Sequence, residues 1–302
     1  MPSSAPSEQL PTTGQVFLDH VGWMVPDMEQ ASVVFDRLGF PLTPYSVHGA
    51  RDGGTGDMKP VGSANRLAML QRGYLEILTP VGDVDSPVTR HMKAAINHHT
   101  GVHLIAFAVP DAEAFAGQIE TAGFKVQPTV HLRRTVEAAN GEQVELSFTV
   151  VRAAFEHFAE ARVQAVTHHT PEHMWQERYL PTENGITGLK EAILVVPEPR
   201  EAAARFARLL DRPIDGLTTP LGVKLDRGAV RFVDARGAAE QFGRIKRPPM
   251  PAVGAITLTS SDLDKTRHFL LSQGLRPGAI DPNHLLIDEA EALGVHIIVV
   301  AD

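Results

Sequence analysis

The stretch "VFLDHVGWMVPDMEQASVVFDRLGF", residues 16–40, contains the signals of both a strand and a helix. It begins with an apolar, β-branched run of the kind that forms strands. Pro26 and Asp27 then supply the chemistry of a helix N-terminus, and apolar residues follow at helical spacing as far as Gly39, a typical helix stop. His20 is the exception, because this polar, metal-competent side chain lies in the middle of the apolar run. The stretch therefore predicts a βα unit whose strand carries one candidate functional residue.

The same pattern occurs three more times, at residues 102–124, 189–213 and 253–275. Shorter alternating runs follow each helical segment, such as "GYLEIL" in the first unit and "VHIIVV" in the fourth. One such unit leaves a sheet face uncovered, whereas two units side by side can curl into a shared, half-closed barrel. We therefore predict an α+β fold of four βαβββ modules, paired into two half-closed, barrel-like domains.

The repeat also predicts where the domains begin and end. The first module pair spans residues 15–180, the second spans 186–302, and "PTENG" at 181–185 forms the turn between them. Residues 1–14 have neither a basic start nor an apolar core, so they do not match a signal peptide. We expect this segment to be a disordered leader.

Composition excludes several classes of function. The 302-residue chain has a formal net charge of -8, which disfavours nucleic-acid binding, and it has no cysteine, which excludes disulfides and thiolate metal sites. Any metal must be held by His, Asp or Glu, which suits Fe, Mn, Zn, Ni or Mg. No apolar run approaches the roughly 18–20 residues of a membrane span. Cytoplasmic residence is the default expectation.

Three segments carry a resemblance to a known family. "LDHVGWMVPDMEQASVVFDRLGF" (18–40), "GSANRLAMLQRGYLEILTP" (62–80) and "THHTPEHMW" (167–175) resemble the vicinal oxygen chelate superfamily of glyoxalases and extradiol dioxygenases, in particular its glyoxalase-like domain subgroup. The resemblance implies that the first and fourth strands of paired modules line a cavity. It also implies that inward side chains of these strands hold a divalent metal ion.

Residue types in the first unit agree with that implication. Glu76 lies between Leu75 and Ile77, where a strand should bury apolar surface. A buried carboxylate without a partner costs several kcal/mol, so we expect it to be paired or bound to a metal. Together with His20, it forms the first part of a predicted metal site.

The resemblance places the third ligand at the end of the last strand of the second module, and there it favours His168. His169 beside it remains an alternative, and we assign it to the substrate-binding residues. His103, on the opening strand of the second module, is off by one from the position of His20, because counting back seven residues from Asp111 gives Leu104. Since side chains alternate along a strand, we expect His103 to point away from the cavity, unless a β-bulge restores its register and makes it a ligand.

Further residues are candidates for contact with the substrate. The resemblance implies that Asn65 and Arg66 lie close to the site, although a surface position for Arg66 is an equal alternative. Three aromatic side chains, Trp23, Phe107 and Trp175, are expected to line the pocket.

Two functions remain open at this point. The first is a metal-dependent enzyme of the glyoxalase or dioxygenase type, a lyase or a ring-cleaving dioxygenase, in which His20, Glu76 and His168 bind one divalent ion. Its partner is a small substrate with vicinal oxygens, and no general base is identified. The second is a metal-free protein of the same fold that binds or sequesters a small molecule such as an antibiotic.

The second module pair is degenerate at the corresponding positions. Glu191 stands where the first pair has His20, and Arg231 lies on a later strand of the same unit. We expect these two side chains to form an ion pair in place of a metal site. The second pair is then chiefly structural, or it contributes to a homodimer.

Overall fold

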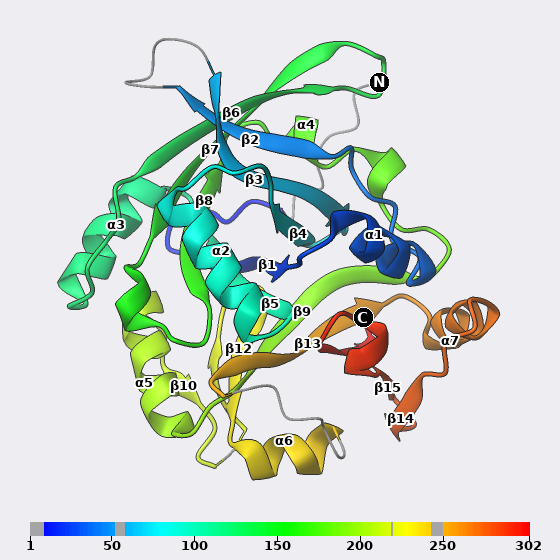
Figure 1. Cartoon of the computed structure of the whole chain (residues 1–302). Coiled ribbons are helices and arrows are strands. Elements are labelled where there is room, and N and C mark those ends of the chain that lie inside the picture. Colours follow the sequence, from blue (N-terminus) through cyan, green and yellow to red (C-terminus); the bar gives the residue numbers. More distant parts are fainter. Residues whose placement is uncertain (1–8, 52–57, 219, 243–249) are drawn as a thin grey trace.

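Two eight-stranded sheets dominate the structure, a computed structural model that describes residues 9–51, 58–218, 220–242 and 250–302 (Figure 1). The first sheet consists of β1 (Phe17–Met24), β2 (Ser46–Arg51), β3 (Met58–Met69), β4 (Tyr74–Pro80), β5 (Gly101–Ala108), β6 (Val130–Glu137), β7 (Gln143–Arg152) and β8 (Arg162–His168). The second consists of β9 (Ile186–Val195), β10 (Ile214–Asp215), β11 (Leu221–Lys224), β12 (Ala229–Val233), β13 (Ala252–Ser260), β14 (Gly278–Asp281), β15 (His284–Ile287) and β16 (His296–Ala301).

Strand order confirms the paired βαβββ modules. The first sheet runs β2-β3-β4-β1-β5-β8-β7-β6, and the second runs β10-β11-β12-β9-β13-β16-β15-β14. In each sheet the opening strands of two modules pair antiparallel at the centre, and each opening strand pairs in parallel with the last strand of its own module. The predicted α+β fold is therefore observed, with the same topology in both halves.

Helices connect and cover the strands. They are α1 (Met28–Arg37), α2 (Pro87–His98), α3 (Ala112–Thr121), α4 (Pro171–Met174), α5 (Pro199–Leu210), α6 (Ala235–Phe242) and α7 (Leu263–Ser272), with short 3-10 turns η2 (Phe155–His157), η3 (Glu177–Tyr179) and η4 (Glu289–Glu291). The repeated helices α1, α3 and α7 each begin at an aspartate whose side chain accepts hydrogen bonds from backbone N–H groups of the first turn. Helix α5 instead ends at Asp211, which adopts a left-handed conformation with a φ of 50°.

The main hydrophobic core lies on the outer faces of the two sheets. It combines Val21 and Trp23 of β1 with Ile256 and Leu258 of β13, so that both halves share one core. Helices α1, α3, α5 and α7 contribute apolar residues to the same core, among them the fully buried Phe206 of α5. The outer faces and these helices bury one another. The concave face of each sheet is therefore not part of this core, and its contents differ between the two halves.

Those concave faces are filled differently. In the second sheet, α6 packs Phe242 and Ala238 against Ile193, Ala255 and Ile298, so side chains fill the hollow. In the first sheet, the corresponding helix α2 reaches only one end, where Met92 packs against Met24, Leu78 and Leu104. The rest of the first hollow remains open as a cavity. A bulky helix plug is thus present in one half and only partial in the other.

The N-terminal segment departs in part from the sequence prediction. Residues 1–8 of the predicted disordered leader lie outside the described residues. Gln9, however, is fully buried, and its side-chain amide accepts a hydrogen bond from the backbone N–H of Gly73 at 3.1 Å. The leader is therefore ordered from Gln9 onward, because this amide satisfies backbone groups that would otherwise be buried unpaired.

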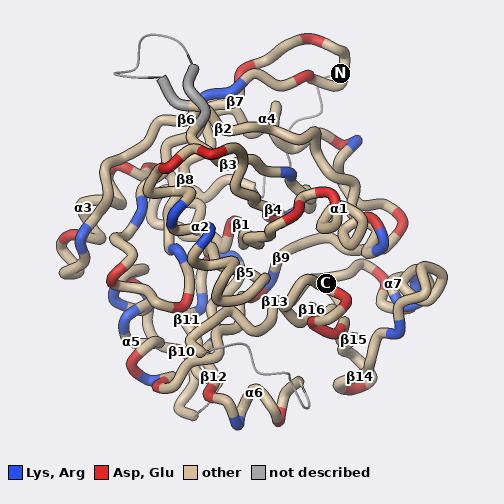
Figure 2. The backbone as a smooth tube through the Cα atoms, viewed as in Figure 1, with Lys and Arg blue, Asp and Glu red and all other residues tan. Residues whose placement is uncertain are grey.

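Charges are spread over the molecule. Figure 2 shows Lys and Arg interspersed with Asp and Glu along the backbone.

Within the part of the chain that the structure describes, no helix is long and apolar enough to cross a membrane.

Candidate functional site

A cavity of about 350 Å³ lies inside the curl of the first sheet. Side chains from all eight strands of this sheet line it, together with Val88 and Met92 of α2 and Met174 of α4. This volume lies at the lower end of the usual range for small-molecule pockets, about 300–1,000 Å³. The cavity is mixed in character, with leucine and valine side chains beside histidine, arginine and a single described carboxylate, Glu76.

His20 and Glu76 converge inside this cavity. In the parallel pairing of β1 with β4, His20 lies opposite Tyr74 and Gly22 lies opposite Glu76, so both functional side chains are on the same face. Nε2 of His20 is 3.7 Å from Oε2 of Glu76. The imidazole also stacks on the Tyr74 ring, with 4.2 Å between centroids. The sequence prediction that these two residues share one site is consistent with this geometry.

Asp19, next to His20, holds two histidines. The pairing of β1 with β5 shifts register between Leu18 and His20, and the carboxylate of Asp19 is completely buried. It accepts hydrogen bonds from Nδ1 of His20 at 2.7 Å and from Nε2 of His168 at 3.1 Å. Burial opposes ionisation, but the charge and hydrogen bonds of His168 and His20 outweigh it and hold the pKa of Asp19 well below its usual range.

The consequence for His20 is a defined orientation. A carboxylate only accepts hydrogen bonds, so Nδ1 of His20 donates to Asp19 and Nε2 is the ring nitrogen on the side of Glu76. Carboxylate–histidine pairs of this kind orient metal ligands as well as general bases. Burial, followed by the charges of Asp19 and Glu76, also raises the pKa of Tyr74, so its phenol stays protonated.

Glu76 is oriented by a second chain of contacts. Nδ2 of Asn65 donates to Oε1 of Glu76 at 2.7 Å, which leaves Oε2 to face His20. Nη1 of Arg134 in turn donates to Oδ1 of Asn65 at 3.2 Å. Asn65 therefore lines the cavity, and both ends of its amide already have partners within the protein.

At the equivalent positions the second module carries a leucine and a glutamine in place of the histidine and the glutamate. Leu104 lies opposite Arg162 and Ala106 lies opposite Gln164, which makes Leu104 the counterpart of His20 and Gln164 the counterpart of Glu76. Nε2 of Gln164 approaches Nε2 of His20 at 3.4 Å, and its Oε1 accepts from Nε of Arg152 at 3.3 Å. The amide of Gln164 thus completes a hydrogen-bonded chain from Arg152 to His20.

Three predicted histidine positions can be compared with the structure. His168 is buried at the end of β8 and lines the cavity, but its Nε2 is bonded to Asp19. His169 is exposed, and its Nε2 hydrogen-bonds to Thr149 at 2.9 Å. His103 points away from the cavity and bonds the carbonyl oxygen of His99, whereas Leu104 lines the cavity, as the register argument predicts.

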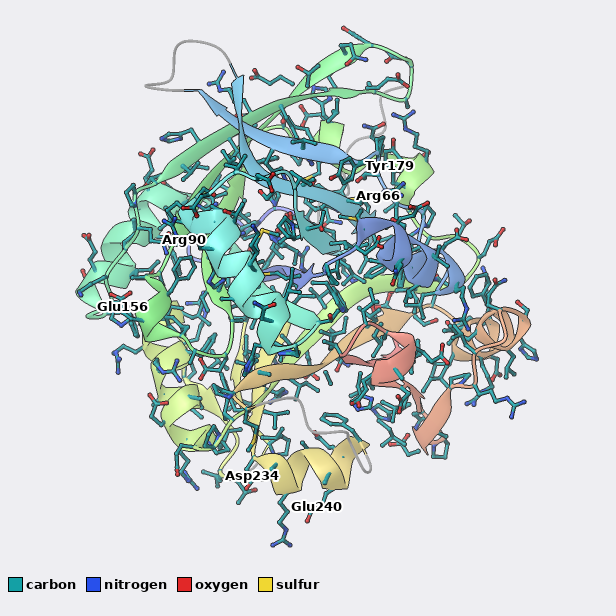
Figure 3. All side chains as sticks on the ribbon, viewed as in Figure 1. Arg66, Arg90, Glu156, Tyr179, Asp234 and Glu240 are labelled. Atoms are coloured by element: carbon teal, nitrogen blue, oxygen red, sulfur yellow. The ribbon has the colours of Figure 1, made fainter. Side chains whose placement is uncertain are left out.

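Most predicted substrate-contacting residues lie elsewhere. Trp23 and Phe107 are completely buried in the core on the outer side of the sheet, because their strand positions have the opposite parity to His20 and Leu104. Trp175 packs behind Tyr74 and His168 and does not line the cavity. Arg66, labelled beside α1 in Figure 3, donates to the carbonyl of Thr43 and to Ser32, so it ties β3 to α1.

The donor atoms of the site meet only part of the needs of a divalent ion. Ligand atoms held about 2.1 Å from a tetrahedral ion lie about 3.4 Å apart. The separation of His20 Nε2 from Glu76 Oε2, 3.7 Å, is close to that value. The Gln164 atom nearest to His20 is the amide nitrogen, a hydrogen-bond donor that cannot bind a metal, and its Oε1 accepts from Arg152 instead. Within the described ranges, however, no group of three or more His, Cys, Asp or Glu is arranged to hold a metal ion. The predicted triad of His20, Glu76 and His168 is therefore not assembled, and His20 and Glu76 are the two predicted donors that converge.

Several residues that line the cavity or support its lining were not identified from the sequence. They are Asp19, Tyr74, Gln164 and three arginines, Arg134, Arg152 and Arg162. Asp19 had a detectable signal, since it is a second polar residue within the same apolar run as His20. The arginines had none, because arginine is common on exposed strand faces and only the curl of the sheet turns these positions inward.

The second half carries an ion pair where the first half carries His20 and Glu76. Nε of Arg231 lies 3.1 Å from Oε1 of Glu191, as the sequence analysis expected. Arg231 also pairs with Asp215 at 2.8 Å, and Thr257 donates to Glu191. His296 pairs with Glu289 and stacks on Phe242, so it packs beneath the α6 plug.

Comparison with known proteins agrees with the fold. A family model described as a glyoxalase-like domain matches residues 18–210, a span that includes every strand of the first sheet apart from Phe17. No curated protein matches the chain.

Several solved structures are similar. A hypothetical protein from Staphylococcus aureus superposes with a TM-score of 0.65 at 10% identity, over 95% of this chain and 100% of that chain. A mutant of 4-hydroxymandelate synthase from Streptomyces coelicolor gives 0.58 at 12% identity, over 95% and 94%. A xylose isomerase-like TIM barrel/4-hydroxyphenylpyruvate dioxygenase fusion protein gives 0.59 at 14% identity, over 99% of this chain and 50% of that chain. At these identities the similarity establishes the fold alone.

Proposed function

Given that the chain belongs to the glyoxalase-like domain family, within the vicinal oxygen chelate superfamily, we propose that it is a metal-dependent enzyme of the glyoxalase or dioxygenase type. Its substrate is a small molecule with neighbouring oxygen atoms, bound in the cavity of the first sheet. The observation that carries this proposal is the convergence of His20 Nε2 and Glu76 Oε2, 3.7 Å apart, inside that cavity.

The residues of the site have distinct tasks in this proposal. His20 and Glu76 would hold the divalent ion, and Gln164 donates a hydrogen bond toward His20 from the neighbouring module. A divalent ion in such a site supplies Lewis-acid stabilisation of negative charge on substrate oxygens. Asp19 accepts the Nδ1 hydrogen of His20, which leaves Nε2 as the nitrogen that would bind the ion. Asn65 fixes the rotation of the Glu76 carboxylate.

One observation favours a second candidate function, a metal-free protein that binds a small molecule. A series of hydrogen bonds connects Arg152, Gln164, His20 and Asp19. Through it both ring nitrogens of His20 have hydrogen-bond partners within the protein. Leu104 occupies the position equivalent to His20, so one of the four equivalent positions offers no ligand atom. In this candidate the same cavity and the same polar groups bind the small molecule directly.

Metal content separates the two candidates. Elemental analysis of the purified protein should find a roughly stoichiometric divalent metal, which is lost in His20→Ala and in Glu76→Gln. His169→Ala serves as the matched control, because His169 is exposed and bonded to Thr149, away from the cavity. Circular dichroism and the unfolding midpoint establish that each variant is folded. Equal trace amounts of metal in all four proteins would reject the enzyme proposal in favour of metal-free binding.

A further inference from the structure

Three arginine side chains enter the cavity from neighbouring strands. Arg134 lies on β6, Arg152 on β7 and Arg162 at the start of β8, and all three line the same space. Their recorded partners are neutral amides, since Arg134 donates to Asn65 and Arg152 donates to Gln164. Neutral amides accept hydrogen bonds but leave the positive charge of a guanidinium uncompensated.

Arg162 is the least satisfied of the three. The residue is only 9% exposed, and its buried Nε has no hydrogen-bond partner. No hydrogen bond or ion pair to its guanidinium is recorded among the described residues. Nε of Arg134 is likewise buried without a partner. Proteins rarely bury an unpaired guanidinium, so these donors point to a ligand that completes them.

The charges of the cavity indicate the sign of that ligand. Among the described lining residues, Glu76 is the one carboxylate, and it faces three guanidinium groups. Asp19 lies behind the lining, and its carboxylate is already shared by His20 and His168. Arg133 does not add to the imbalance, because it pairs with Glu145 at 3.2 Å. The described side chains of the cavity therefore carry a surplus of positive charge.

The pKa values of two of these arginines are lowered inside the cavity. Burial is the main cause that lowers the pKa of Arg162, and burial followed by the charge of Arg162 lowers the pKa of Arg152 to about 9. A bound anion would oppose both effects by supplying the missing countercharge.

The remaining walls are apolar. Leu67, Leu78, Leu104, Leu132 and Phe148 line the same cavity. A ligand that fits both parts therefore has an apolar body and one strongly acidic group.

We propose that the substrate of this site carries a carboxylate or phosphate group and that Arg162 binds this group, flanked by Arg134 and Arg152. This inference deepens the proposed function and rests on it for the identity of the site, but it does not require a metal. Arginine forms paired, charge-assisted hydrogen bonds with either oxyanion, so the geometry is shared by both groups.

Binding of small probes tests the proposal directly. Isothermal titration calorimetry at low salt compares benzoate and phenyl phosphate with uncharged benzamide, which has the same apolar body. We expect at least one of the two anions to bind at least about tenfold more tightly than benzamide, since a hydrogen bond to a charged group contributes that much. Tighter binding of phenyl phosphate than of benzoate assigns a phosphate, and the reverse order assigns a carboxylate.

Variants establish which arginine is responsible. Arg162→Gln should weaken anion binding at least about tenfold and leave benzamide unchanged, whereas Arg236→Gln, an exposed arginine on α6, should change neither. Arg152→Gln provides the same readout if Arg162→Gln does not fold. Equal affinities for benzoate, phenyl phosphate and benzamide, or anion binding unchanged in every folded arginine variant, would overturn the proposal.

The same titration on His20→Ala separates this inference from the proposed function. Anion binding that persists in that variant supports the role of Arg162 whether or not the wild-type protein contains metal. Anion affinity that disappears together with bound metal would show that the metal, rather than Arg162, holds the anion, and would overturn the inference alone.

Discussion

Asp19 accepts hydrogen bonds from His20 and His168 at once, so that one buried carboxylate joins the first strand of the first module to the last strand of the second. The two histidines are 148 positions apart in the sequence, but their ring nitrogens contact the same group. This contact orients His20 toward Glu76 and accounts for the direction of His168. The orientation of both histidine rings therefore depends on the carboxylate of Asp19.

Replacement of Asp19 by asparagine should disturb both histidines. The amide can donate as well as accept, so it no longer requires a proton on Nδ1 of His20, and the free energy of unfolding should fall by about 2–4 kcal/mol. Urea denaturation measures the loss, and nitrogen-15 NMR of the imidazoles reports the tautomer of His20. The exposed Asp83→Asn is the control. An unchanged tautomer with unchanged stability would contradict the role given to Asp19.

The pair Arg205–Glu160 should stabilise the contact between the two halves. Arg205 of α5 makes two hydrogen bonds to Glu160, at 2.6 and 3.0 Å, and Glu160 has a side chain only 4% exposed. Loss of this buried partner in Glu160→Gln should cost about 3 kcal/mol of unfolding free energy.

Glu201 provides a matched control for that prediction. It binds the same Arg205 at 3.0 Å, but its side chain is 62% exposed. Glu201→Gln should therefore cost less than about 0.5 kcal/mol in the same urea titration. Similar losses in the two variants would mean that burial does not decide the strength of these contacts.

Truncation of Phe242 should open the second hollow. Its ring is 5% exposed, stacks on His296 and fills the concave face that the first sheet leaves open. Phe242→Ala should lower the unfolding free energy by about 3–5 kcal/mol, because the methylene and ring contacts are lost and a void remains. Thermal unfolding measures the change, with Leu217→Ala at an 88% exposed site as control. Equal effects at both sites would contradict the role of α6 as a plug.

Acid should destabilise the protein in part through His91. Burial, followed by the charges of Arg162 and His103, lowers the pKa of His91 from 6.5 to about 4, and its ring stacks on Phe155. Between these pH values the unfolded chain binds a proton that the folded protein does not, so stability falls as pH falls from 6.5 to 4. His91→Phe keeps an aromatic ring stacked on Phe155 and removes the imidazole that binds this proton.

The measurement is the unfolding free energy at several pH values across that window. The variant should lose less stability toward acid than the wild type, with a remaining slope from His99, whose pKa is also lowered to about 4. The exposed His268→Gln on α7 should keep the wild-type slope. A slope in His91→Phe as steep as in the wild type would refute the assignment.

The architecture follows from local sequence signals. Each repeated unit encodes its own strand, its helix start and its helix end, as at Asp27 and Gly39, and these choices depend on residues only a few positions apart. The alternation of side chains along β5 was sufficient to turn His103 away from the cavity and Leu104 toward it. The convergence of His20 with Glu76 follows from the same alternation once their strands are neighbours.

The contents of the cavity were decided only by the tertiary structure. A register shift beside Asp19 places its carboxylate between His20 and His168, and no local pattern encodes such a shift. The outward placement of Trp23 and Phe107 is different, because their parity relative to His20 and Leu104 is itself a local signal. Arg162 meets Arg134 and Arg152 only in the tertiary structure, since residues remote in sequence become neighbours only when distant strands close around a common space.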